Sequence, residues 1–175
     1  NDFVHQGWAI LSLAYITHFN GNEEEIASLI QNILSIININ DLSQKILLIQ
    51  AINLILIYHR EEIQFPAEII GIAQEFLEDP CATTEMKNEC ISTILIFNSQ
   101  IDPDHAQSLF SDLSLDALTD NYSLVFLESI KELATIAAQF YIADNDRFAE
   151  AIIKITFFAA TSEANIWVQI KEEVR

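Results

Sequence analysis

The sequence predicts an all-α protein, and within that class a superhelix of stacked helix pairs. Apolar residues recur at helical spacing along most of the chain, as in the stripe from Ile26 to Ile37, and alternation with a period of two is nowhere sustained. Only three glycines and three prolines interrupt the 175 residues, which indicates long elements joined by short turns. The starts of the long helices also repeat at a nearly constant interval.

Capping residues and prolines set the expected helix boundaries. Asn22 with Glu25 forms a capping-box-like start for one helix. Asp102 precedes Pro103, an N-cap followed by a proline in the first turn of the next helix. Together these signals predict helices over about 2–19, 23–38, 41–60, 66–78, 83–99, 103–112, 121–142 and 145–160, with a ninth beginning at Ser162.

Alternate helices begin near residues 3, 41, 83, 121 and 163, a spacing of about 40 residues. Stacked helix pairs of this length are typical of HEAT and armadillo solenoids, in which each pair buries its apolar face against the next. We therefore expect a HEAT/armadillo-like α–α superhelix of about four helix pairs plus a partial fifth, filling residues 1–175 as a single domain. A bundle of helices with irregular lengths is the alternative.

The polar pair Thr161-Ser162 is expected to separate the last complete helix pair from the start of the fifth. Ser162 would cap the new helix, and Trp167 would pack on the preceding pair. Because the chain starts at Asn1 rather than at a methionine, we also expect it to be a fragment of a longer solenoid.

The charge is strongly acidic. Asp and Glu number 26 against 8 Lys and Arg, a formal net charge of −18. A field of this sign repels phosphate backbones and anionic lipid headgroups, so the sequence predicts no binding to nucleic acid or membrane surfaces and favours basic partners. The alternative is that the acidic residues only keep an apolar protein in solution.

No constellation of residues predicts catalysis, a metal site or a cofactor. The four histidines have no metal-ligand spacing, and glycines at only 7, 21 and 71 leave no phosphate-binding loop. The stretch ADNDRFAE at 143–150 lacks the third oxygen ligand and the glycine of a calcium loop, and is expected to be a turn. Cys81 and Cys90 are expected to be free thiols in a reducing compartment. We therefore expect a protein that is not an enzyme.

In a solenoid the second helix of each pair lines the concave surface. Arg147 and Lys154 are the cations on these helices in the expected arrangement, against a larger number of acids. A concave wall of this sign would attract a partner rich in lysine and arginine. The acids predicted to contact that partner are Glu68, Glu75, Asp112, Asp146 and Glu150.

The C-terminal third, residues 121–175, resembles the importin-β (karyopherin) superfamily, in particular transportin-like members. In that family a helix ends in a small break, and the next helix carries a tryptophan followed by a glutamate. The stretch IWVQIKEEV at 166–174 is similar, because Trp167 and Glu172 agree with the pattern and Ile170 and Val174 are conservative replacements. The flanking aromatic residues of the family are absent here. The preceding stretch, 121–160, resembles the paired helices that come before that motif.

The resemblance implies a HEAT superhelix that binds cargo and a Ran-type GTPase and shuttles between cytoplasm and nucleus. It therefore leads us to expect a segment of a nuclear transport receptor for basic cargo. An unrelated HEAT or armadillo adaptor in a cytosolic assembly is the first alternative. A compact helical bundle that acts as an enzyme or binds a ligand in a closed interior pocket is the second.

Overall fold

The computed structural model describes residues 6–20, 22–37, 41–59, 67–98, 100–114, 124–143 and 145–173. Within these ranges every regular element is a helix and no strand occurs, so the predicted all-α class is confirmed. The elements are α1 (Gln6–Asn20), α2 (Glu23–Ile36), α3 (Leu42–His59), α4 (Glu68–Glu78), α5 (Thr84–Phe97), α6 (Pro103–Asp112), α7 (Leu124–Ala143), the short 3-10 helix η2 (Asn145–Phe148) and α8 (Ala149–Glu173).

The predicted caps of α2 and α6 are confirmed. The Asn22 side chain accepts a hydrogen bond from the backbone N–H of Glu25 at 3.0 Å, and the Glu25 carboxylate accepts one from the backbone N–H of Asn22 at 3.1 Å, which completes a capping box before α2. Asp102 is the N-cap of α6, because its side chain accepts a hydrogen bond from the backbone N–H of His105, and Pro103 lies in the first turn. The predicted start of the helix over 66–78 lies outside the described residues.

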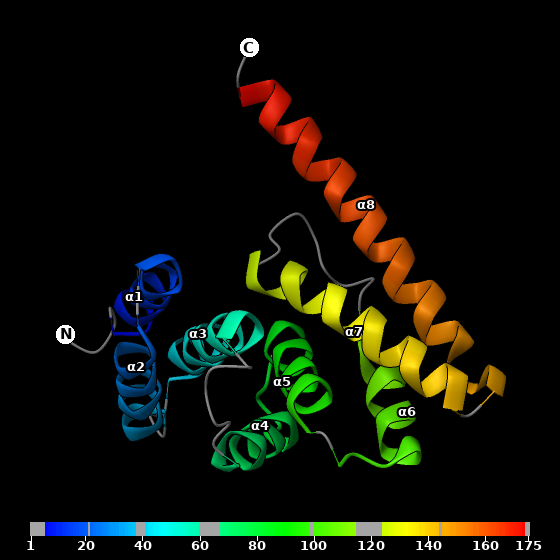
Figure 1. The fold of residues 1–175 in the computed structure, drawn as a ribbon, viewed down its shortest axis with the longest axis horizontal. Helices are drawn as coiled ribbons and strands as arrows, with labels where there is room; N and C mark the ends of the chain where they lie inside the picture. The colour runs from blue at the N-terminus through cyan, green and yellow to red at the C-terminus, as the bar shows by residue number, and fades with distance from the viewer. Residues whose placement is uncertain are drawn as a thin grey trace.

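The odd-numbered helices form a continuous row (Figure 1). α1 packs against α3, α3 against α5, and α5 against α7. Each even-numbered helix lies beside this row: α2 contacts α1 and α3, α4 and α6 contact α5, and α8 contacts α7. α7 also packs against α3, although these two helices are not neighbours in the row.

The core is centred on α3, and this central position explains why the sequence of α3 is so strongly apolar. Leu48, Ile52 and Ile55 are fully buried, and so are residues on the other sides of the same helix such as Ile49 and Leu56. A helix that is apolar around its whole circumference needs partners on several sides, and α3 has α1, α2, α5 and α7. Among the described residues, none of the helices combines the length and the apolar character that crossing a bilayer requires.

The predicted helix break at Thr161-Ser162 is wrong. Residues 149–173 form one helix of 25 residues, so the predicted start of a fifth helix pair is absent from this segment. The hydroxyl of Thr161 donates hydrogen bonds of 3.0 Å to the backbone carbonyls of Phe157 and Phe158. A threonine that bonds back to the preceding turn is compatible with a helix interior, and no new cap is needed. The C-terminal part of α8 extends away from the other helices (Figure 1); the packing predicted for the Trp167 side chain lies outside the described residues.

Candidate protein-binding groove

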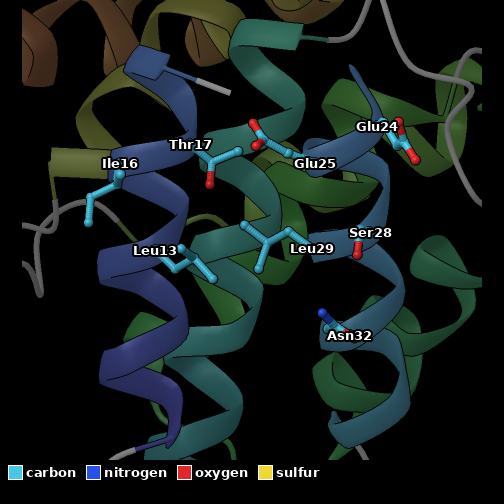
Figure 2. A pocket seen from close by; sticks show the side chains of 8 residues that line it. All are labelled: Leu13, Ile16, Thr17, Glu24, Glu25, Ser28, Leu29 and Asn32. Carbon is cyan, nitrogen blue, oxygen red and sulfur yellow. The ribbon is translucent and has the colours of Figure 1, made fainter. Parts of the chain in front are cut away.

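A groove with a volume of about 560 Å³ lies between α1 and α2 (Figure 2). Its two walls differ in chemistry, because α1 contributes mainly apolar side chains and α2 contributes mainly polar and acidic ones. The described residues that line it are Leu13, Ile16, Thr17, Glu24, Glu25, Ser28, Leu29 and Asn32.

The α1 wall exposes apolar surface. The exposed fraction is 46% for Leu13 and 59% for Ile16, whereas Thr17 and Leu29 are buried at the bottom of the groove. Figure 2 shows Leu29 reaching from α2 toward Leu13, so the apolar surface continues across the floor from one helix to the other. Exposed apolar side chains that adjoin one another around a hollow make this groove a candidate binding surface.

The α2 wall carries the negative charge. Glu23, Glu24 and Glu25 form the first turn of α2, where the helix dipole favours acidic residues. Glu25 has a structural role in the capping box, and its side chain points toward Thr17 at one end of the groove (Figure 2). Among the described lining residues none is basic, and the two glutamates lie at this end of the groove.

The five acids predicted from the sequence are all exposed but are distributed over four elements. Glu68 and Glu75 lie on α4, which packs against α5. Asp112 ends α6, Asp146 lies in η2, and Glu150 begins α8. Figure 1 separates α4 from η2 and the start of α8, with α6 between them. The structure therefore places the predicted residues in at least two regions, and none of the five lines the α1–α2 groove.

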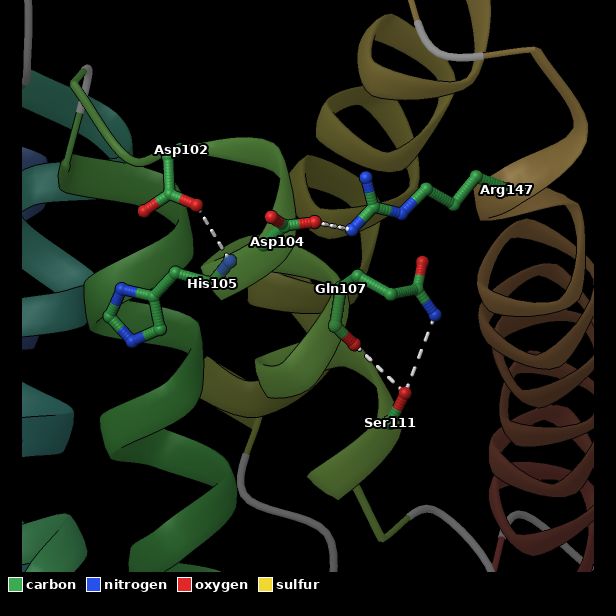
Figure 3. Close-up of polar contacts among 6 residues, drawn as sticks. All are labelled: Asp102, Asp104, His105, Gln107, Ser111 and Arg147. Carbon is green, nitrogen blue, oxygen red and sulfur yellow. Dashed lines mark hydrogen bonds and ion pairs between the residues drawn. The ribbon is translucent and has the colours of Figure 1, made fainter.

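The second acidic region, around α6 and the start of α8, contains two cations with polar contacts, and Figure 3 shows the contact of Arg147. The guanidinium of Arg147 forms an ion pair with Asp104, and the ammonium of Lys154 donates a hydrogen bond to the backbone carbonyl of Leu113. Both interactions join the η2–α8 segment to α6 or to the residue that follows it. Because the Asp104 carboxylate is highly exposed, solvent screens its ion pair and reduces its contribution to stability.

Two acids of this region have further local contacts. The Asp146 carboxylate accepts a hydrogen bond of 3.1 Å from the Tyr141 hydroxyl, and this bond raises the pKa of Tyr141 above its ordinary value. Glu150 borders a small hollow of about 110 Å³ together with Gln107 and Ser111 of α6. These contacts connect α6 and α7 to the η2–α8 segment, and they leave the carboxylates exposed to solvent.

Metal sites and reactive thiols each have a characteristic geometry, with which the described residues can be compared. No three His, Cys, Asp or Glu side chains within the described ranges come close enough together to hold a metal ion. Burial, together with the nearby charge of Glu89, raises the pKa of the Cys90 thiol to about 12, so this thiol is protonated at neutral pH. Cys81 is exposed.

Leu13 and Ile16, like the other residues that line the groove, are not among the partner-contacting residues predicted from the sequence. They lie in the stretch AILSLAYI, which is apolar on several faces of its helix, so periodicity does not separate the buried face from the exposed one. The sequence signal for them is that this helix carries more large apolar residues than one buried face can hold, so some of them must be exposed.

Comparison with known proteins gives no relative for this chain: no protein-family model, no curated protein and no solved structure matches it.

Proposed function

We propose that this protein is a protein-binding helical scaffold that recognises a basic segment of its partner. The observation that carries the proposal is the α1–α2 groove, where the exposed apolar side chains of Leu13 and Ile16 on α1 face a second wall that includes Glu24 and Glu25 of α2. Apolar surface supplies affinity when it is removed from water, and fixed charge of one sign selects the partner and accelerates its approach.

The charge of the whole chain supports a basic partner. The formal net charge is −18, and exposed acids extend beyond the groove onto α4, α6, η2 and α8. Arg147 forms an ion pair with Asp104, so its charge is largely offset by that carboxylate, and Lys154 lines the same hollow as Glu150. A lysine- or arginine-rich segment would therefore meet an attractive field over several faces of the molecule.

A HEAT-like superhelix is the architecture that we propose for the scaffold. The row formed by α1, α3, α5 and α7, with the even-numbered helices beside it, supports stacking of successive helix pairs. The contact between α3 and α7 is a departure from stacking between neighbours alone. Small-angle X-ray scattering tests this proposal, since a superhelix gives the scattering of an elongated curved particle and a closed bundle gives that of a globule.

Transport of basic cargo into the nucleus is the specific form of this function that the importin-like stretch implies. The uninterrupted α8 lacks the helix break of that family, so the support for this form is Trp167, Glu172 and the apolar spacing alone. A pull-down with Ran loaded with GTP tests it. Specific retention of Ran would support a transport receptor that shuttles between cytoplasm and nucleus, and absence of retention would favour an adaptor in a cytosolic assembly.

Binding of a basic peptide tests the general proposal. We expect a fluorescein-labelled peptide rich in lysine and arginine to bind at about 50 mM salt and to bind markedly more weakly at about 300 mM, because screening shortens the reach of exposed charges. A control peptide of the same length with glutamine in place of each basic residue is expected not to bind. Equal affinity for both peptides, or no binding of the basic one, would contradict the proposed function.

A further inference from the structure

We propose that the α1–α2 groove binds an amphipathic α-helix of the partner, with the apolar residues of that helix on Leu13 and Ile16 and its basic residues near Glu24 and Glu25. This inference rests on the proposed function and specifies the structure and orientation of the segment that is bound. Two observations support it. One wall of the groove is apolar and the other is polar and acidic, and both walls are α-helices.

The apolar part of the groove fits anchors from one face of a helix. Leu13 and Ile16 are three residues apart on α1, so their side chains lie on neighbouring turns of the same face. Both are about half exposed, and Leu29 extends the apolar surface to the α2 side. An incoming helix with apolar residues at i, i+3 or i+4, and i+7 would cover this surface in the way that amphipathic helices dock into apolar grooves.

The walls favour a helical segment over an extended one. An extended peptide gains affinity by pairing its backbone with the free edge of a sheet. α1 and α2 bond their own backbone groups internally and offer no such edge. An extended peptide would therefore place unsatisfied N–H and C=O groups against Leu13, Ile16 and Leu29, whereas a helix satisfies its own.

The charge is located at one end of the groove, which gives the bound helix a direction. Glu24 and Glu25 lie in the first turn of α2, and the lining residues farther along that helix, Ser28 and Asn32, are uncharged. The lining part of α2 spans about two helical turns. We therefore expect a segment of two to three turns whose lysines and arginines concentrate at the end beside the glutamates, where opposite charges attract.

Two peptides of identical composition test the helical form. The first, of about 18 residues, places leucines at i, i+4, i+7 and i+11 with lysines at one end, and the second has the same residues in an order that disperses the leucines around the helix. The readout is fluorescence anisotropy at about 100 mM salt. We expect the amphipathic peptide to bind at least about tenfold more tightly, because only it can bring its leucines onto one surface.

Two pairs of matched variants test the location. Leu13→Ser with Ile16→Ser is expected to weaken binding of the amphipathic peptide about tenfold. The control Ile153→Ser with Phe157→Ser removes two similarly exposed apolar residues from α8 and is expected to leave binding unchanged.

The second pair of variants tests the charged end of the groove. Glu24→Gln with Glu25→Gln is expected to weaken binding several-fold, and more than Glu68→Gln with Glu75→Gln, which changes the net charge equally on α4. Glutamine at 25 still suits a capping box, so α2 should remain folded.

The outcomes separate this inference from the proposed function. If both peptides bind equally, with a strong dependence on salt and no effect of the α1 substitutions, the scaffold still binds basic segments but the helix-in-groove model is wrong. If neither peptide binds, both proposals are contradicted. A further outcome is that the chain self-associates and that the double variant Leu13→Ser with Ile16→Ser abolishes this self-association. That result would assign the groove to a second copy of the chain and would also overturn the inference. Urea unfolding of each variant establishes that the fold is intact, and the comparison of the two peptides on the unaltered chain needs no substitution.

Discussion

The backbone N–H of Gly7 donates a hydrogen bond of 2.6 Å to the side-chain carbonyl oxygen of Gln44, across the contact between α1 and α3. A Cβ atom added at Gly7 would lie 2.6 Å from that oxygen and 3.0 Å from Cβ and Cδ1 of Leu47. α1 therefore approaches α3 closely because position 7 has no side chain. This contact fixes the helix that supplies the apolar wall of the groove.

The two helical glycines are expected to respond to alanine in opposite directions. Gly7→Ala should lower the free energy of unfolding by about 1–3 kcal/mol, because the methyl group pushes α1 away from α3. Gly71→Ala should raise it by about 0.5–1 kcal/mol, because nothing lies within 4 Å of the added methyl group and alanine favours the helix. Urea denaturation of both variants measures the difference. Equal effects would show that the close approach of α1 and α3 is not required.

A buried polar network between α3 and α5 predicts a large loss of stability on truncation. The amide of Asn53 donates to the carboxylate of Glu89 at 2.9 Å, and the carbonyl of that amide accepts from the hydroxyl of Thr93 at 2.7 Å. All three residues are at most 1% exposed. Asn53→Ala is expected to lower the free energy of unfolding by about 2–4 kcal/mol, because it removes bonds to buried groups and leaves a cavity.

The matched control for this network is Ser35→Ala. The Ser35 hydroxyl also donates a hydrogen bond, to the carbonyl of Asn32 at 2.7 Å, but it does so at the exposed surface of α2. Its removal should change the free energy of unfolding by less than about 0.5 kcal/mol, because water replaces the partner. Urea denaturation midpoints that coincide for the two variants would contradict a stabilising role of the α3–α5 network.

The two cysteines are expected to differ in reactivity and in their effect on alkaline stability. Ellman's reagent should modify the exposed Cys81 in the folded protein and Cys90 only in denaturant. Burial, followed by the charge of Glu89, raises the pKa of Cys90 from 9.0 to about 12. Between these values the unfolded chain loses the thiol proton while the folded chain retains it, so stability is full below pH 9 and falls as the pH rises toward 12.

The size of this alkaline effect follows from the linkage of proton binding to folding. The single thiol should contribute a slope of about 1.4 kcal/mol per pH unit in that window, and Cys90→Ala should remove this contribution. Unfolding free energies measured from pH 8 to pH 11 on both proteins give the difference in slope. Identical slopes, or rapid modification of both thiols in the folded state, would contradict the burial of Cys90.

The continuity of α8 predicts how its polar pair responds to alanine. In a continuous helix the double substitution Thr161→Ala with Ser162→Ala should leave stability unchanged or raise it by up to about 1 kcal/mol, because alanine is the better helix former. At a helix break with a serine cap the same change would cost about 1 kcal/mol. Circular dichroism followed through thermal unfolding distinguishes the two cases by the direction of the shift in midpoint.

The features that could be predicted from the sequence depend on chemistry within one turn of a helix. The capping box of Asn22 with Glu25 and the cap at Asp102 involve residues three positions apart, so neighbouring sequence is sufficient to place them. The stripe on α2 was predicted for the same reason, and Ile26, Ile30 and Ile33 are buried.

The features that could not be predicted depend on contacts between distant segments. Thr161 can begin a break or bond back to the preceding turn, and nothing within the sequence of α8 selects between these conformations. Leu13 and Ile16 belong to a helix that is apolar on several faces, and which face is buried depends on the approach of α3 through Gly7. The predicted acids fall in separate regions. They were selected because a solenoid would place their helices on its concave surface, and no predicted contact joined one acid to another.

Hydrogen–deuterium exchange with and without the amphipathic basic peptide tests the central claim most directly. If the groove binds a basic helix, amides of α1 and α2 should exchange more slowly in the complex, because a bound segment suppresses local opening of the helices it contacts. Amides of α4 and of the exposed part of α8 should exchange at unchanged rates. Slower exchange confined to α4, α6 or α8, with α1 and α2 unaffected, would contradict this account.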